Sequence, residues 1–383
     1  MMHYRNYLAL KAPMLLGWLQ KHRVAPNPLT HPRTRRTEEN SARPGYSFYK
    51  KGDYHLGAPI PPTMVRPSGA SGSSYSAMIA GHGSDLPSTR PFGYFDVHDV
   101  RYSPNFGVHS SPNGNFIDTY CSDAALGNPK YELARLALPV MPLGGRWPEG
   151  ILIAPAWYHN FYHWLVDILP RLANVTDSLK AGVPIIVPDR LSRVQLHTLR
   201  LALAAAGVPQ AEVIALNGGT HHFARAIIPT RLSATLDMSH AQRNFMRAMM
   251  PGVDSQPSGR IYVSRRDAAI RRIVNEDEIE ALLQRRGFRT VTMSGLPFEE
   301  QARLFGGAEA IIGHHGAAFA SWAFCRAGTP AIEIFQEGHF APSFARMAQL
   351  GELRYGFCVG KAQDADTWLD PAQLEEVLGL AGL

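Results

Sequence analysis

From residue 150 onward, short apolar runs of strand length alternate with segments of helical periodicity. The first two runs, at 151–154 and 184–187, are followed by helix patterns at 161–175 and 193–206. Strands that alternate with helices form βαβ units, in which helices cover both faces of a parallel sheet. This alternation predicts an α/β fold for most of the chain.

A stretch rich in proline, glycine and serine at 251–259 interrupts the alternation, which then restarts. Asn275 is placed to cap one of the later helices, with Glu278 at capping-box spacing. The strands expected after the linker are 260–263, 288–291, 310–312 and 331–335. Two doubly wound units joined by a hinge predict a cleft between them, and ligands of such sheets bind beyond the carboxyl ends of the strands.

We therefore expect three regions along the 383 residues, a length that allows two domains with separate cores. Residues 1–90 are expected to form an irregular N-terminal extension rich in basic residues, proline, glycine and serine. Residues 91–250 and 251–383 are expected to form two Rossmann-like α/β domains, with the last helix free to pack back on the first of them.

The formal net charge is +6, and much of the basic excess lies in the first 55 residues. Such an arm fits an anionic membrane surface, an acidic polymer or simple solubility, and no DNA-binding motif accompanies it. The three cysteines lack a CxxC pattern, which favours a reducing compartment. No apolar run reaches the roughly 18 residues of a transmembrane helix. We expect a cytoplasmic protein without a nucleic-acid partner, with peripheral contact at the inner face of the membrane as one interpretation of the arm.

The first candidate site lies in the helix pattern that starts near Asn160. His163 and Asp167 are four residues apart, so on a helix they share one face and can hydrogen-bond. A carboxylate beside an imidazole makes a general base, because each group biases the protonation of the other. A buried pair that stiffens the helix explains the same pattern equally well.

The second candidate site is the basic turn Ser264-Arg265-Arg266, which directly follows an expected strand. Arginine forks suit bidentate binding of phosphate and can neutralise a leaving diphosphate without a metal ion. Arg271 and Arg272 follow, and two of these four arginines are more typical of a solvated helix face. Ser264 and Arg265, nearest the strand end, are the stronger candidates.

The third candidate site is the turn Gly313-His314-His315-Gly316-Ala317, between an apolar strand and small residues that open a helix. Backbone amides at a helix N-terminus bind anions, and His315 can donate to a phosphate oxygen. Glu333, at the end of the next expected strand, is placed to accept a ribose hydroxyl. Together with the second site, this turn predicts that one phosphorylated ligand binds at two neighbouring strand ends.

Other patterns carry less weight. Asp364 and Asp366 have the spacing of a divalent-metal pair, but they lie in a polar loop that follows no strong strand, so we expect no metal site and no cofactor. A phosphoester hydrolase built on His163, Asp167 and the later histidines would need a metal cluster that the spacing does not supply.

Taken together, these motifs resemble glycosyltransferase family 61, which includes bacterial capsular and exopolysaccharide enzymes. The resemblance covers residues 150–360 and rests on the three ordered blocks described above. It implies a GT-B architecture: two Rossmann-like domains, with the acceptor mainly on the first and the nucleotide-sugar donor on the second. It also implies an inverting, metal-independent transfer of a hexosyl or pentosyl group, most simply from a UDP-sugar.

The resemblance assigns roles residue by residue. Asp167 is favoured as the catalytic base, with His163 orienting it or holding the acceptor. The acceptor side is assigned to Asn160, Tyr162 and Arg171, and the donor diphosphate to Ser264, Arg265, Arg266, His314, His315, Gly316, Ala317 and Glu333. The chain departs from the family pattern after Ala317, where 318–322 and 325–330 alter the expected sugar-side contacts, so the identity of the donor sugar is not carried over.

The leading interpretation is therefore a glycosyltransferase of polysaccharide or glycolipid biosynthesis. The alternative is a non-catalytic nucleotide- or glycan-binding protein with the same two-domain fold. Asp167 and Arg265 discriminate between the two, and the presence of both favours the enzyme.

Overall fold

The computed structural model describes residues 46–55, 89–104, 106–110, 142–154, 157–233, 238–253, 256–339 and 341–383. All of them belong to one compact unit, 44–383. Most of the N-terminal extension expected at 1–90, and with it most of the basic arm, lies outside the described residues.

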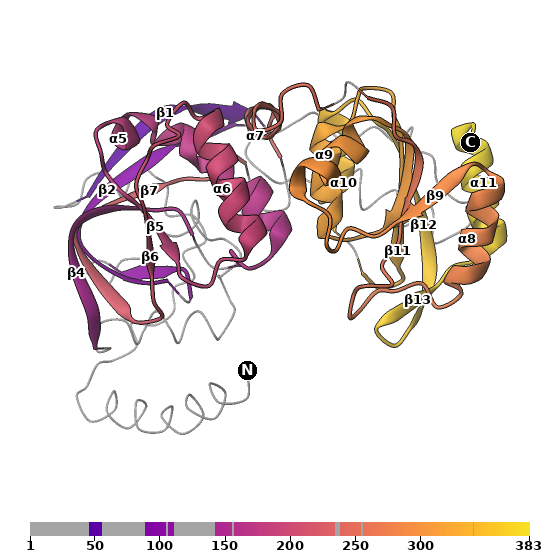
Figure 1. Ribbon diagram of the computed structural model, residues 1–383, viewed down its shortest axis with the longest axis horizontal. Coiled ribbons are helices and arrows are strands. Elements are labelled where there is room, and N and C mark those ends of the chain that lie inside the picture. Colours follow the sequence, from indigo (N-terminus) through magenta and orange to yellow (C-terminus); the bar gives the residue numbers. More distant parts are fainter. Residues whose placement is uncertain are drawn as a thin grey trace. The chain divides into compact units, whose positions relative to one another are not determined.

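The first sheet is mixed, with strand order β1-β2-β7-β4-β5-β6 and β3 paired with β2 (Figure 1). Strands β7, β4, β5 and β6 run parallel, as the βαβ pattern predicted, whereas β1 and β2 add an antiparallel edge. The strands are β1 (Tyr46–His55), β2 (Thr89–Ser103), β3 (Val108–Ser110), β4 (Leu143–Leu152), β5 (Ile185–Pro188), β6 (Val213–Leu216) and β7 (Thr220–Pro229). Because β1 lies within 1–90, that stretch is not irregular throughout.

The helical segment after β4 departs from α-helix geometry. It forms the π-helix η2 (His163–Ile168) and the 3₁₀-helix η3 (Leu169–Asn174). Pro170 has no amide hydrogen, so it cannot donate to a carbonyl of the preceding turn. Side chains bind carbonyls there instead: Gln242 donates to the carbonyl of Val166 at 2.9 Å, and Arg171 donates to that of Asp167 at 2.7 Å. Such single-turn π segments are frequent at functional sites.

The remaining helices of this half are α-helical. They are α5 (Thr176–Lys180), α6 (Arg193–Ala205) and α7 (His240–Ala248). Full capping boxes start α6 at Ser192 and α7 at Ser239, each with a glutamine side chain that returns the hydrogen bond. These caps fix where both helices begin, and α7 thereby brings Gln242 to η2.

The second sheet has strand order β13-β12-β11-β10-β8-β9, parallel except for β13. The strands are β8 (Gly259–Val263), β9 (Phe288–Val291), β10 (Ala308–His314), β11 (Pro330–Gln336), β12 (Arg354–Gln363) and β13 (Asp366–Trp368). Its parallel strands follow the doubly wound order 2-1-3-4-5, in which the direction of winding reverses between β8 and β10. Ligands of such sheets bind at this switch point, beyond the carboxyl ends of the strands.

Helices cover both faces of the second sheet: α8 and α11 lie on one face, and α9 and α10 on the other (Figure 1). The bounds are α8 (Glu276–Arg285), α9 (Phe298–Gly306), α10 (Ser343–Leu350), α11 (Pro371–Ala381) and the 3₁₀-helix η4 (Ala317–Phe324). The capping box expected at Asn275 is wrong, because its amide bonds the Glu278 side chain and the backbone of Leu369 instead. Helix α11 packs on β12 and α8, not on the first sheet.

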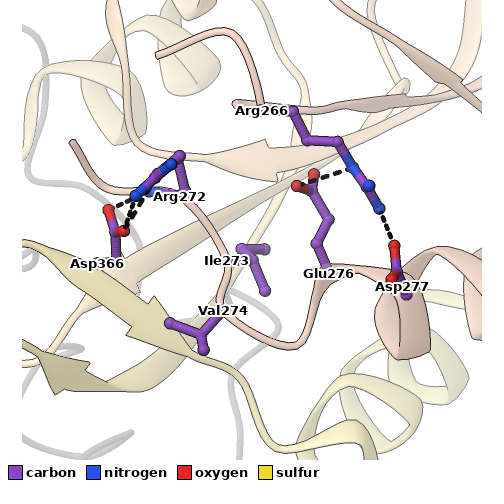
Figure 2. Close-up of a pocket in the computed structure, with 7 residues that line it drawn as sticks. All are labelled: Arg266, Arg272, Ile273, Val274, Glu276, Asp277 and Asp366. Atoms are coloured by element: carbon purple, nitrogen blue, oxygen red, sulfur yellow. Dashed lines mark hydrogen bonds and ion pairs between the residues drawn. The ribbon is translucent and has the colours of Figure 1, made fainter. Parts of the chain in front are cut away.

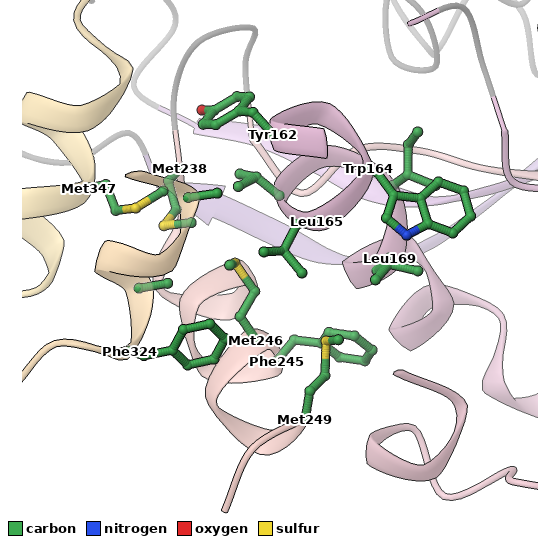
Figure 3. Packing of buried hydrophobic residues seen from close by; sticks show 14 of the residues in the cluster. Tyr162, Trp164, Leu165, Leu169, Met238, Phe245, Met246, Met249, Phe324 and Met347 are labelled. Atoms are coloured by element: carbon green, nitrogen blue, oxygen red, sulfur yellow. The ribbon is translucent and has the colours of Figure 1, made fainter. Parts of the chain in front are cut away.

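The main hydrophobic cluster contains side chains from both halves of the chain. Trp164 and Leu165 of η2 belong to it together with Met246 of α7, Phe324 of η4 and Met347 of α10 (Figure 3). The chain length suggested two fully separate cores, but this cluster is shared by both halves of the chain. At about 25 cal/mol per Å² of buried apolar surface, such a shared cluster stabilises the contact between η2, α7 and η4.

The structure bears on two further expectations from the sequence. Cys325 and Cys358 are buried free thiols, and Cys121 lies outside the described residues. Among the described segments, no helix combines the length and the apolar character needed to cross a bilayer.

Candidate functional site

Helix η2 places a histidine–carboxylate pair after the carboxyl end of β4. His163 Nδ1 lies 2.6 Å from Asp167 Oδ2, and because the carboxylate accepts, Nδ1 carries the hydrogen. The Asp167 side chain is 5% exposed and that of His163 is 17% exposed. The i,i+4 contact predicted from the sequence is thus confirmed, and the imidazole is the more accessible partner.

Arg231, which follows β7, completes this pair. Its Nη2 donates to the second carboxylate oxygen of Asp167 at 3.0 Å, and both side chains are buried. Burial alone would raise the pKa of Asp167, but Arg231, His163 and Arg171 outweigh it and lower that pKa. A carboxylate with a lowered pKa and both oxygens hydrogen-bonded is a weak base. In this arrangement the carboxylate of Asp167 orients the ring of His163, and the assignment of Asp167 as the base stays a prediction.

The residues expected on the acceptor side have structural partners. Asn160 accepts a hydrogen bond from the amide of Tyr162 at 2.9 Å and so holds the first turn. Arg171 is 1% exposed and donates to the carbonyls of Asp167 and Pro229, so it is too buried to meet an acceptor. The ring of Tyr162 packs edge-on against His163, with 5.4 Å between ring centroids.

The turns after β8 and β10 flank the switch point of the second sheet. Val263 pairs with Gly313, so the two strands end at the same level. The Arg265 guanidinium fills the space above Gly316, where a Cβ would lie only 2.1 Å from its Nη1. Two neighbouring strand ends thus meet at this edge, as the sequence predicted, and glycine is required at 316 for the arginine to approach.

His315 is held by a second carboxylate. Its Nδ1 donates to Glu333, which is 0% exposed, and the Tyr355 hydroxyl donates to the other Glu333 oxygen at 2.7 Å. Burial, together with the Glu333 charge, raises the pKa of Tyr355 well above its usual value, so this hydroxyl keeps its proton. Glu333 is therefore occupied within the protein and does not fit the expected contact with a ribose; it orients His315.

Arg271 and His339 also belong to this edge, and the sequence did not assign them. Arg271 Nη1 lies 3.4 Å from His339 Nε2, and the ring of His339 lies 5.1 Å from that of His315. Within the described residues, neither Arg265 nor Arg271 forms an ion pair, and the buried Arg271 Nε has no hydrogen-bond partner. Burial lowers the pKa of both arginines, and for Arg265 the charge of Arg271 adds to the effect. Arg265 donates to the backbone carbonyls of Ile270 and Arg271. Two cations without a carboxylate contact favour an anion nearby.

Three of the residues expected to bind the diphosphate are committed to other partners. Ser264 is buried and donates to Glu276 at 2.7 Å, and Arg266 pairs with Glu276, Asp277 and Glu280. His314 hydrogen-bonds Thr367 at 2.8 Å, and burial lowers its pKa to about 3, so it is neutral at pH 7. Gly316 and Ala317 stand where expected, at the start of η4.

The pocket shown in Figure 2 lies beside this edge and has a different character. Its lining includes two ion-paired sets, Arg272 with Asp366 and Arg266 with Glu276 and Asp277 (Figure 2). Asp364 and Asp366 have the spacing of a divalent-metal pair, but the Asp366 carboxylate is bound to Arg272. No group of three metal-ligating side chains occurs in the part of the chain that the structure describes.

A chain of ring contacts joins the two histidine–carboxylate pairs. Phe344 of α10 packs edge-on against Tyr162, with 5.5 Å between centroids, and lies 4.9 Å from the ring of His315. Tyr162 in turn contacts His163. His163 and His315 are therefore linked through two aromatic side chains, Tyr162 just before η2 and Phe344 on α10.

Comparisons with known proteins place these residues in a family. The family model described as Glycosyltransferase 61 matches residues 161–332. Among solved structures, the heptosyltransferase WaaC from E. coli with ADP is similar over 62% of this chain and 98% of that chain, at 10% identity and a TM-score of 0.31. A flavo di-iron protein mutant from Thermotoga maritima is similar over 56% of this chain and 51% of that chain, at 11% identity and a TM-score of 0.27.

The chain thus spans about half the length of that flavo di-iron protein. Neither structural likeness is close enough to carry an argument, and the comparison with curated proteins gave no match. The family match, by contrast, contains His163, Asp167, Arg265 and His315, the residues that carry the site geometry. Residues 161–332, which hold these side chains, match glycosyltransferase family 61.

Proposed function

We propose that the chain is an inverting glycosyltransferase of GT-B type. It moves a hexosyl or pentosyl group from a nucleoside-diphosphate sugar, most simply a UDP-sugar, to a hydroxyl of a polysaccharide or glycolipid acceptor. The observation that carries the proposal is the pairing, within one family match, of an accessible histidine–carboxylate base with an uncompensated cationic edge at a sheet switch point. The first takes a proton, and the second holds an anionic leaving group.

In the proposed reaction, an acceptor hydroxyl gives its proton to the free ring nitrogen of His163, whose Nδ1 stays hydrogen-bonded to Asp167. The hydroxyl oxygen attacks the anomeric carbon. The bond from that carbon to the diphosphate oxygen breaks, and its electron pair leaves with the nucleoside diphosphate. One displacement of this kind inverts the anomeric configuration.

The charge that develops on the diphosphate meets Arg265 and Arg271, together with His315 and the amides at the start of η4. Because two guanidinium groups supply the positive charge, the proposed reaction is independent of a metal ion. The protein acts in the cytoplasm, in polysaccharide biosynthesis, and its basic N-terminal arm brings it to anionic glycans or to the inner face of the membrane.

Thermal-shift measurements with nucleoside diphosphates and nucleotide sugars test this function. A ligand that binds the native state stabilises it by mass action and so raises the thermal midpoint. At a ligand concentration of a hundred times Kd, the free energy of unfolding rises by about 2.7 kcal/mol. We expect at least one nucleoside diphosphate to stabilise the chain, equally with and without EDTA. No shift with any of them contradicts the proposal, and stabilisation without turnover on any glycan acceptor favours a non-catalytic binding protein.

A further inference from the structure

Trp157 holds a backbone conformation that bulky side chains rarely adopt. Its φ is +72°, in the left-handed region that favours glycine. The residue lies between β4 and η2, and its carbonyl accepts a hydrogen bond from the amide of Asn160 at 2.8 Å, which closes the turn into η2. Non-glycine residues kept in this region cluster at functional sites, where the surrounding structure sustains the strain.

This turn brings the indole ring next to the proposed base. The ring centroid of Trp157 lies 6.4 Å from that of His163 and 5.8 Å from that of His159, at tilts of 43° and 36°. His159 is exposed and Trp157 is half-buried, so part of this aromatic surface meets solvent. Because Nδ1 of His163 is committed to Asp167, a molecule that gives up a proton here must approach the other ring nitrogen.

Trp157 is more exposed than the tryptophans of the hydrophobic core. Those at 164 and 322 are 0% exposed and belong to the main hydrophobic cluster, whereas Trp157 is half-buried. A glycine would satisfy the turn with less strain. The position combines the backbone cost with a partly exposed aromatic side chain beside His163.

We propose that Trp157 is the stacking platform for the acceptor sugar, a subsite that holds one of its hydroxyl groups at His163. An aromatic face packs well against the C–H face of a sugar ring, while polar groups at its edge fix the orientation of the hydroxyls. Holding the acceptor beside the base makes the proton transfer effectively intramolecular. This inference rests on the proposed function, because the role of His163 gives the platform its purpose.

The test uses the full chain and Trp157→Gly, which removes the ring and relieves the strained φ at once. The probes are methyl α- and β-pyranosides of common hexoses and pentoses, measured by saturation-transfer NMR. We expect wild type to bind at least one of them through C–H protons of one sugar face, and Trp157→Gly to bind it at least tenfold more weakly. Trp157→Phe should keep part of the affinity, because it keeps an aromatic face.

Glu352→Gly is the matched control. Glu352 also has a positive φ, +55°, but it is exposed and lies in the turn between α10 and β12. Relief of strain there should leave glycoside binding unchanged. If Trp157→Gly keeps the thermal midpoint of wild type and loses the glycoside, the ring serves binding and not folding.

Two results would overturn the platform directly: equal glycoside binding by Trp157→Gly and wild type, or no glycoside binding by wild type. A third would as well: if Trp157→Gly lost only the contact with the sugar of a nucleotide sugar, Trp157 would belong to the donor site. Binding of nucleoside diphosphates is followed in parallel. Its absence from wild type would contradict the proposed function, whereas its presence together with any of the three results would contradict only the platform.

Discussion

Two histidine–carboxylate pairs occur in this chain, and their surroundings differ in a way that separates their roles. At His163, the carboxylate of Asp167 also binds Arg231, so the negative charge is compensated twice and the outer ring nitrogen is left to act on a ligand. At His315, the carboxylate of Glu333 binds the neutral hydroxyl of Tyr355. We propose that the same pair of groups serves proton transfer in one place and anion binding in the other.

The cations around the two pairs explain the difference. Arg231 is buried against a carboxylate. Arg265 instead donates to the backbone carbonyl of Arg271, Arg271 lies beside His339, and neither arginine forms an ion pair in the described residues. A compensated cation stabilises a charge that is already present in the fold. An uncompensated pair of cations attracts a charge that the ligand brings.

The largest expected effect is on turnover when the first imidazole is removed. His163→Gln should lower the transfer rate by roughly 10²–10⁴-fold, the usual contribution of a general base, because glutamine cannot take the proton. Steady-state rates with saturating donor and acceptor measure this. His197→Gln is a control on a histidine whose partner is Glu299 and not Asp167; an equal loss in both variants would remove the special role of His163.

The next effect is on stability when the compensated carboxylate is neutralised. Asp167→Asn removes a negative partner of the buried Arg231, and breaking a buried pair in this way costs about 3–5 kcal/mol. Urea unfolding monitored by circular dichroism gives the value. Neutralising the half-buried Asp366, which pairs with the exposed Arg272, should cost much less, because solvent screens an exposed pair. Equal losses would show that Arg231 has another partner of similar strength.

A smaller effect is expected when a single methyl group displaces Arg265, which lies near the second pair. In Gly316→Ala the added Cβ would stand 2.1 Å from Arg265 Nη1, so the guanidinium must move. We expect about tenfold weaker binding of a nucleoside diphosphate, equivalent to about 1.4 kcal/mol, with the fold retained. Gly379→Ala, which adds a methyl group where nothing lies within 4 Å, is the control. Unchanged affinity in Gly316→Ala would show that this position of Arg265 does not matter for binding.

A pH dependence of stability is expected from the buried ring of His314 beside the second pair. Burial lowers the pKa of His314 from 6.5 to about 3, so between these values the unfolded chain binds a proton that the folded chain excludes. The free energy of unfolding should therefore fall on acidification by about 1.4 kcal/mol per pH unit below pH 6.5. His314→Gln should flatten that slope in urea unfolding from pH 7 to pH 5; an unchanged slope would contradict the assignment.

The sequence located the strand ends and the i,i+4 pair, because both follow from local periodicity. The π geometry of η2 could not be predicted, since it depends on Gln242 reaching the carbonyl of Val166 from α7. Arg231 could have been found, because it follows β7, whose carboxyl end lies beside that of β4. No local sequence pattern marks His339 as a site residue. Arg271 has a positive φ, a backbone conformation that the sequence does not indicate for an arginine.

Ser264, Arg266 and Glu333, which were expected to bind the ligand, share one physical feature. Each side chain stands at or just after a strand end, where ligands bind, and each has a partner within the protein. Sequence position shows which edge of the sheet a residue occupies. It does not show whether Glu276, for example, has already taken the hydrogen bond that a ligand would need.

The central claim is that proton transfer and anion binding are divided between the two pairs, and one calorimetric comparison tests it. The nucleoside diphosphate that stabilises wild type is titrated into wild type, His163→Gln and Arg265→Ala under one buffer condition. We predict that His163→Gln binds it as wild type does, whereas Arg265→Ala binds it at least tenfold more weakly. Equal weakening in both variants, or full affinity in Arg265→Ala, would contradict this division.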